Sequence, residues 1–265
     1  MHDVRPAAVA GSFYPAVSAR LADTLSGHLA HARVTHGKPP KAVVVPHAGY
    51  VYSGTVAAAA YARVAALRGV ATRVVLLGPA HRVAVRGLAV PVARAFVTPL
   101  GMVAIDPDAV ARVLTLPQVV ESDSAHAHEH SLEVQLPFLQ TVLGDFSLVP
   151  FVVGSATPGE VAAVIDLLWG GPETLIVVSS DLSHFLPYAD ACRDDRRTAD
   201  SILALASEIA HDQACGATVI NGFIQSARRR GLRPELLDLC NSGDTAGDRA
   251  RVVGYAAFAF SEHAH

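Results

Sequence analysis

Residues 73–81 read RVVLLGPAH, a short apolar run that leads directly into a histidine. Two further stretches share this layout: residues 42–47 read AVVVPH, and residues 175–184 read LIVVSSDLSH. Each apolar run is rich in β-branched residues and too short for a helix, which is typical of a strand buried on both faces of a parallel sheet. Parallel strands end at one edge of a sheet, and open α/β sheets bind their ligands there. We therefore expect the three histidines to meet in one metal or acid/base site.

Helix-like and strand-like segments alternate along the sequence, with no repeat or low-complexity linker between them. Expected helices cover residues 18–33, 53–67 (capped by Ser53), 106–114, 159–168, 189–210 and 216–230, and another begins near Glu129 or Ser131 and ends or kinks at Pro137. Further strands are expected at residues 88–92, 146–153 and 251–260. The alternation predicts one domain over residues 1–265, a three-layer α/β/α sandwich with a central, mostly parallel sheet.

The composition favours a soluble, globular protein. Of the 265 residues, 51% are hydrophobic and 17% are charged, which is enough apolar material for a substantial core. The formal net charge is -3, and the clearest basic run (228–230) is followed by glycine as at a helix end, so we expect no nucleic-acid partner. The sequence shows neither an apolar stretch of about 18 residues nor the apolar core of a signal peptide. We therefore expect no membrane association and a cytoplasmic location.

His47 and His81 are the first site candidates, because each follows its strand in a turn rich in proline and glycine. Such turns are rigid and would hold an imidazole in a fixed position. One histidine of this kind is most simply a loop residue with ordinary hydrogen bonds. Two at equivalent strand ends favour a shared functional site.

Asp181 and His184 follow the third strand. Their separation of three residues suits one turn of a helix, so both side chains could point into the same pocket. A helix-capping aspartate beside a surface histidine is the simpler alternative for Asp181 alone. A serine nucleophile is less favoured, because the sequence lacks the Gly-x-Ser-x-Gly elbow.

Cys215 stands just ahead of an expected helix, whose positive end would favour thiolate over thiol. A thiolate there could be a metal ligand or a nucleophile, and a small buried apolar side chain is an equally good interpretation. Cys192 and Cys240 have no comparable setting and are expected to be structural. Three cysteines make no disulfide framework.

Residues 126–133 read HAHEHSLE, a segment rich in potential ligands. Alternate histidines can chelate a metal ion, and Glu129 could accept or donate a proton. Much of the run is also compatible with a polar loop and the first turn of a helix. We select Glu129 and His130 as the preferred members, with His126 and His128 as weaker candidates.

These same residues carry a family resemblance. The motifs read GSFYP at residues 11–15, PHAGY at 46–50, GPAH at 78–81, EHSLE at 129–133, SSDLSH at 179–184 and CG at 215–216. In this combination the chain resembles the Memo family, whose fold is similar to that of class III extradiol ring-cleaving dioxygenases. The matching motifs run from residue 11 to beyond 216 and so cover nearly the whole chain.

The resemblance implies that His47, His81 and Cys215 are metal ligands and that Asp181 and His184 line the same pocket. It also implies a redox metal, with iron (Fe2+) expected first and copper as the alternative; zinc, which is not redox-active, is the metal of a competing hypothesis. Some eukaryotic members have been described as binding phosphotyrosine peptides. Prokaryotic members often accompany a radical S-adenosylmethionine protein, which implies such a partner in a modification pathway.

The leading functional hypothesis is a metal-dependent oxidoreductase, with an unknown small-molecule or peptide substrate. His184 would shuttle protons, Asp181 would orient His184 or the metal-bound species, and Glu129 and His130 would complete the pocket. Cysteine in place of the usual carboxylate distinguishes this ligand set from that of the non-haem iron oxygenases. The alternatives are a zinc hydrolase with Glu129 or His184 as base, and a non-catalytic binding module that retains the metal cleft.

Overall fold

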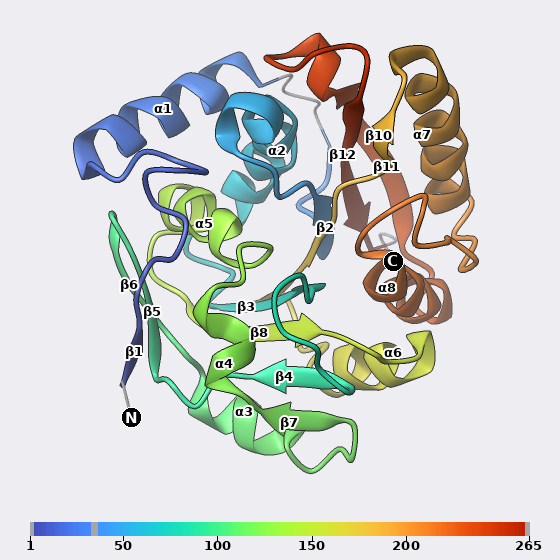
Figure 1. Ribbon diagram of the computed structural model, residues 1–265. Helices are drawn as coiled ribbons and strands as arrows, with labels where there is room; N and C mark the ends of the chain where they lie inside the picture. Colours follow the sequence, from blue (N-terminus) through green and yellow to red (C-terminus); the bar gives the residue numbers. More distant parts are fainter. Residues whose placement is uncertain (1–2, 33–36, 263–265) are drawn as a thin grey trace.

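A nine-stranded sheet with helices on both faces forms the centre of the protein, as Figure 1 shows. The computed structural model describes residues 3–32 and 37–262. The strand order is β10-β12-β2-β9-β3-β8-β4-β7, and β11 pairs with β12 outside this path. The predicted α/β sandwich is confirmed. A separate three-stranded sheet, β1-β5-β6, joins residues near the N-terminus to a hairpin from residues 95–104 and was not predicted.

The strands are short and largely buried. Those of the large sheet are β2 (Ala42–Val45), β3 (Arg73–Pro79), β4 (Leu88–Val90), β7 (Val119–Glu121), β8 (Ser147–Val153), β9 (Thr174–Ser179), β10 (His184–Leu186), β11 (Arg233–Asn241) and β12 (Val252–Ser261). Those of the small sheet are β1 (Val4–Arg5), β5 (Ala95–Thr98) and β6 (Gly101–Ala104). Strand β11 was missed in the sequence because charged residues interrupt its apolar positions.

The centre of the large sheet is parallel and its flanks are largely antiparallel. Strands β2, β9, β3 and β8 run in the same direction, whereas β12 and β4 join this group antiparallel. The sheet is therefore mixed, where the sequence predicted a mostly parallel one. The prediction that matters for function holds, because the three histidine-bearing segments follow neighbouring parallel strands.

Helices cover both faces of the sheet. They are α1 (Ser18–His31), α2 (Tyr50–Val64), α3 (Pro107–Val113), α4 (Asp123–Ala127), α5 (Leu136–Leu143), α6 (Pro158–Leu167), α7 (Tyr188–Leu203) and α8 (Ala217–Arg229), with 3-10 turns η1 (Ala65–Leu67), η2 (Glu133–Gln135) and η3 (Ser242–Asp244). One apolar core packs α2 and α5 against the sheet, and a second packs α6 and α8 on the other face. No helix of the described residues is both long and apolar enough to cross a membrane.

Two helix starts differ from the sequence prediction. Helix α2 begins at Tyr50 behind Gly49, and Ser53 lies inside it with its hydroxyl bonded to the Ala48 carbonyl rather than capping the helix. Pro137 does not end a helix but stands in the first turn of α5, where its missing N–H costs no hydrogen bond. Residues 129–135 are consequently a loop and a 3-10 turn, which leaves Glu129 and His130 free of helical geometry.

Other helix boundaries shift by a few residues. Helix α7 ends at Leu203 and not near residue 210, and α1 ends at His31, while residue 33 of its expected range lies outside the described residues. Asp181 and His184 do not share a helical turn. Asp181 lies in the loop after β9, and His184 begins β10, which pairs with β12.

Candidate metal centre

The candidate residues lie at one edge of the sheet, where neighbouring parallel strands end. His47 follows β2, His81 follows β3, and Ser179 ends β9, which lies between these two strands. Strand pairing aligns Val45 of β2 with Ser179 of β9. The loop that follows α4 brings His130 to the same place from a distant part of the chain.

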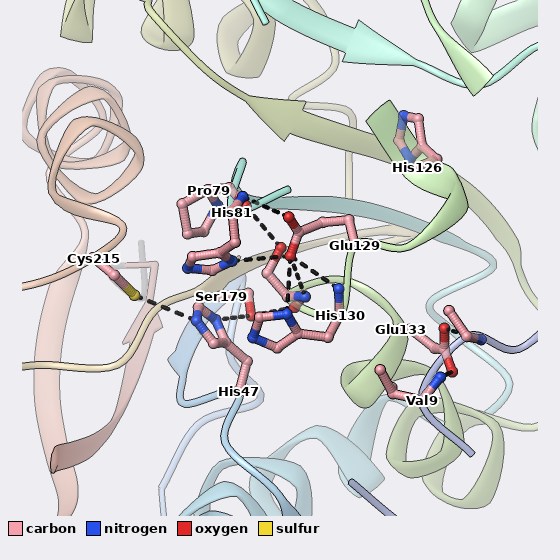
Figure 2. Close-up of polar contacts among 12 residues, drawn as sticks. Val9, His47, Pro79, His81, His126, Glu129, His130, Glu133, Ser179 and Cys215 are labelled. Atoms are coloured by element: carbon pink, nitrogen blue, oxygen red, sulfur yellow. Dashed lines mark hydrogen bonds and ion pairs between the residues drawn. The ribbon is translucent and has the colours of Figure 1, made fainter. Parts of the chain in front are cut away.

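Three histidines form a compact group at this edge. One ligand-capable nitrogen from each of His47, His81 and His130 lies within 4.8 Å of the other two. The ring centroids are 5.2 Å apart for His47 and His81, 5.4 Å for His47 and His130, and 4.7 Å for His81 and His130. Figure 2 shows the three rings converging from separate segments. The sequence predicted all three as site residues, with His130 in a catalytic role rather than as a ligand.

The hydrogen bonds of Ser179 fix the tautomer of His47. The Ser179 hydroxyl donates its one proton to the Ser131 carbonyl at 2.6 Å and accepts from Gln135 Nε2 at 2.8 Å. Its distance to His47 Nδ1 is 2.9 Å. Because the hydroxyl proton is already used, His47 Nδ1 must carry the hydrogen and donate it. The Nε2 lone pair of His47 is therefore free for a ligand.

Glu129 orients His81 in the same way. Oε1 of Glu129 lies 2.9 Å from His81 Nδ1, and Oε2 accepts from the His81 backbone N–H at 2.6 Å. Oε1 also accepts from the N–H groups of His130 and Ser131, both at 2.9 Å. These hydrogen bonds outweigh burial and hold the pKa of Glu129 at about 2. As an ionised acceptor, Glu129 requires a proton on His81 Nδ1, which leaves His81 Nε2 for a ligand.

This arrangement changes the expected role of Glu129. From the sequence alone, Glu129 is expected to accept or donate a proton. Four N–H groups surround its carboxylate, and the lowered pKa keeps it ionised throughout the neutral range. The structure therefore favours an orienting role over a proton-transfer role.

His130 is nearly buried and incompletely hydrogen-bonded. Phe13 packs on its ring, with centroids 4.7 Å apart. Its Nδ1 atom has no hydrogen-bond partner among the described residues, although Glu129 Oε1 lies 3.3 Å away. Burial lowers the pKa of His130 to about 4 and the pKa of His47 well below its usual value, so both rings are neutral at pH 7.

The residues fit a bound cation. Neutral imidazoles supply lone pairs rather than positive charge, and the ionised Glu129 stands directly behind them. Carboxylate–histidine pairs of this kind commonly support metal ligands, because the carboxylate fixes the ring and raises its basicity. The orphaned nitrogen of His130 is the expected sign of a buried polar group whose partner is an ion or water.

Cys215 approaches the group from the other side of His47, as Figure 2 shows. Its Sγ atom lies 3.3 Å from His47 Nε2, the nitrogen that Ser179 leaves free. The residue precedes α8 as predicted, but the predicted thiolate does not follow. Burial, reinforced by the charge of Asp181, raises the pKa of Cys215 to about 12. The positive end of α8 does not overcome this cost, so a thiolate here requires a cation beside it.

Asp181 and His184 lie in the same region as the clustered histidines. Oδ1 of the buried Asp181 accepts the backbone N–H of His47 at 2.7 Å. Burial raises the pKa of Asp181 to about 7, and burial with the nearby His81 lowers the pKa of His184. The expected contact in which Asp181 orients His184 stays a prediction.

The weaker candidates lie apart from this centre. His126 is buried against Ala89, whose carbonyl lies 2.9 Å from its Nε2 atom, and His128 is not in the group of three. Cys192 and Cys240 are free thiols that line a cavity beside α7, also away from the centre. Gln135 was not predicted from the sequence. Its contribution is the hydrogen bond from its Nε2 atom to the Ser179 hydroxyl, and no sequence motif indicates this contact.

Comparison with known proteins identifies the family. A family model described as Memo-like protein matches residues 5–259. A MEMO1 family protein of Ignicoccus hospitalis is 37% identical, over 97% of this chain and 98% of its own length, and one of Aquifex aeolicus is 36% identical, over 97% and 99%. A crystal structure of an uncharacterized protein from Escherichia coli K12 covers 84% of this chain and all of its own, with a TM-score of 0.54 and 12% identity, and supports the fold alone. The chain belongs to the Memo-like family.

Proposed function

We propose that this protein is a metal-dependent oxidoreductase with a mononuclear centre held by His47, His81 and Cys215. One observation carries the proposal. His47 and His81 each have Nδ1 engaged by a fixed partner and Nε2 left free, and the thiol of Cys215 faces His47 Nε2 at 3.3 Å. Two oriented imidazoles and a sulfur at one sheet edge are a metal-ligand set.

The donor types suit a transition-metal ion, and among such ions iron and copper are redox-active. Imidazole suits iron, copper and zinc, and thiolate selects softer ions over magnesium or calcium. When bound, such an ion would supply one-electron redox chemistry that the side chains alone do not provide. The dioxygenase-like architecture implied by the sequence resemblance agrees with this chemistry, and iron is our first expectation.

The surrounding residues would handle protons. The pKa of about 7 for Asp181 lets it exchange a proton near neutral pH, and the lowered pKa of His184 keeps its ring neutral and able to accept one. His130 shares the space with His47 and His81 and is neutral, so it would contribute a hydrogen bond or a further donor. Phe13 covers the ring of His130 and shields it from water.

Metal analysis of anaerobically purified protein tests the proposal. We expect stoichiometric iron in the wild type and its loss in His47→Ala, His81→Ala and Cys215→Ala. His211→Ala is a matched control, since His211 is exposed and bonds Thr218 on α8. Full metal occupancy in His47→Ala or His81→Ala would overturn the assignment. If Cys215→Ala kept its metal and His130→Ala lost it, His130 and not Cys215 would be the third metal ligand.

The same preparations separate the competing functions. Stoichiometric zinc without redox metal would favour a hydrolase, although the saturated carboxylate of Glu129 leaves that residue unsuited as the base. Oxygen uptake with a reductant supports the oxidoreductase. A binding module would retain its ligand after metal removal. The family resemblance also leads us to propose a radical S-adenosylmethionine protein as a partner, which co-purification from the native host would test.

A further inference from the structure

Arg5 connects the start of the chain to the loop that carries Glu129 and His130. It ends β1 and is 5% exposed. Its guanidinium donates from Nε to the His126 carbonyl at 2.9 Å and from Nη2 to the Glu129 carbonyl at 2.7 Å. The carbonyls at a helix C-terminus lack partners within the helix and carry negative partial charge. Arg5 therefore caps the end of α4 and fixes the turn that leads to Glu129.

Glu133 completes this anchor from the other end of the loop. It is fully buried and forms an ion pair with Arg5 Nη1. Its carboxylate also accepts the N–H groups of Ala8 at 2.8 Å and Val9 at 3.0 Å, together with the hydroxyl of Tyr14. The bonds to residues 8–14 hold the N-terminal segment against the loop, so the ion pair is part of a connected network rather than an isolated contact.

The loop between these anchors controls two of the three clustered histidines. His130 is part of it, and His81 is oriented by the Glu129 carboxylate. Phe13, from the same N-terminal segment, packs on the His130 ring. Figure 2 shows Glu133 beside Val9, on the far side of the loop from His47 and Cys215. Arg5 and Glu133 form no hydrogen bond with the clustered rings. The charge of Glu133 acts on the pKa of His130 directly, whereas the orientation of His81 depends on these two residues only through the loop.

We propose that the Arg5–Glu133 ion pair is a positioning device for the candidate centre. It sets the Glu129 carboxylate, and through it the tautomer and ring direction of His81, and it fixes the place of His130. The part of this proposal that concerns metal affinity rests on the metal centre proposed above. The tautomer of His81 in the metal-free protein is independent of that function and provides a separate test.

The test compares Arg5→Met with Arg73→Met. Arg73 forms a 2.7 Å ion pair with Asp106 at the opposite end of β3, so both variants lose one arginine–carboxylate pair but only one loses it near the histidines. Nitrogen-15 NMR of the metal-free protein reports the tautomer of His81, and titration with Co2+ reports affinity. We expect Arg5→Met to lose the fixed Nδ1–H form of His81 and to bind Co2+ about tenfold more weakly. Arg73→Met should match the wild type in both.

Arg5→Lys provides a milder variant. Lysine keeps a charge for Glu133 but lacks the planar fork that spans two carbonyls, so an intermediate effect is expected. If Arg5→Met does not fold, Arg5→Lys decides the question. Unchanged His81 tautomer and Co2+ affinity in a folded Arg5 variant would overturn the proposal. Should wild type and Arg73→Met both fail to bind Co2+, the metal centre fails, and the tautomer comparison still tests the positioning role.

Discussion

The Nε2 atom of His47 lies 3.3 Å from the Sγ atom of Cys215, although 168 residues separate them in sequence. Each atom is prepared for this contact by its own surroundings. Ser179 binds the opposite nitrogen of His47, and burial keeps Cys215 protonated with its pKa at about 12. The thiol proton of Cys215 faces the free lone pair of His47 Nε2. A metal cation could take the place of this proton and bind both atoms.

Cys215 is expected to remain a thiol in the metal-free protein up to about pH 10, because burial raises its pKa to about 12. Absorbance of thiolate at about 240 nm, followed from pH 7 to about 10, checks this. Cys192→Ser and Cys192→Ser/Cys215→Ala proteins should give the same trace, since the exposed Cys192 is removed from both. A rise near pH 8 that only the first protein shows would contradict the prediction. Addition of Co2+ should release a proton and produce a thiolate-to-metal band.

Ser179→Ala should lower both stability and metal affinity. The change leaves the buried N–H donors of His47 and Gln135 and the Ser131 carbonyl without their common partner. We expect a loss of about 1–3 kcal/mol in the free energy of unfolding and a Co2+ affinity reduced about tenfold. Urea denaturation and Co2+ titration measure the two effects. Ser226→Ala is the control, because that buried hydroxyl of α8 lies away from the centre and makes only long bonds, at 3.4 Å to the Ala162 carbonyl and at 3.2 Å from Arg229 Nη2. Equal losses in both variants would speak against the tautomer assignment.

Asp181 should make the metal-free protein less stable as the pH rises. Burial raises its pKa from 3.8 to about 7, so the folded state binds more protons than the unfolded state between these values. The free energy of unfolding therefore falls between about pH 4 and 7, by about 1.4 kcal/mol for each unit of pKa difference. Asp181→Asn keeps an acceptor for the His47 N–H and removes the titration. Denaturation at pH 5 and pH 8 should show a smaller pH dependence in the variant; identical slopes would disprove the assignment.

Gly254→Ala should disturb the loop that holds Asp181 and His184. A Cβ atom at Gly254 would lie 2.0 Å from Asp195 Oδ2, while Oδ1 of Asp195 accepts the Ser183 N–H at 3.0 Å. Relief of the clash displaces Asp195 and releases Ser183, at a cost of about 1–3 kcal/mol in the free energy of unfolding. Thermal unfolding measures it.

Gly27→Ala gives the matched comparison for that prediction. A Cβ at Gly27 of α1 meets nothing within 4 Å, so alanine should raise helix stability by about 0.5–1 kcal/mol. The free energy of unfolding should therefore fall in Gly254→Ala and rise in Gly27→Ala. A neutral or stabilising effect of Gly254→Ala would show that Asp195 can move without consequence.

The sequence predicted the edge of the sheet and most residues that meet there. His47 and His81 were identifiable because β2 and β3 are buried on both faces, so their apolar runs end where the chain leaves the core. His130 was selected from a histidine-rich segment, but its position as a member of the cluster depends on loop geometry. Local patterns do not encode such geometry when tertiary contacts determine it.

Arg5 and Glu133 illustrate what the sequence could not reveal. Arg5 belongs to no motif, Glu133 ends the ligand-rich segment 126–133 without being selected from it, and 128 residues separate the two. Both residues matter because their charges are buried against each other. This burial depends on the packing of the N-terminal segment against the loop, which the sequence does not show. The antiparallel flanks of the sheet were missed for a related reason, since strand direction at an edge depends on long connections rather than on composition.

The position of β2 between β9 and β12 has a consequence for protein synthesis. Both hydrogen-bonding neighbours of β2 lie far downstream, at Thr174–Ser179 and Val252–Ser261. When His47 leaves the ribosome, its strand has no partner and must wait for most of the chain to be translated. We therefore expect the centre proposed above to take shape only after β12 has been synthesised, so that an ion would be bound late, once the neighbours of β2 are in place.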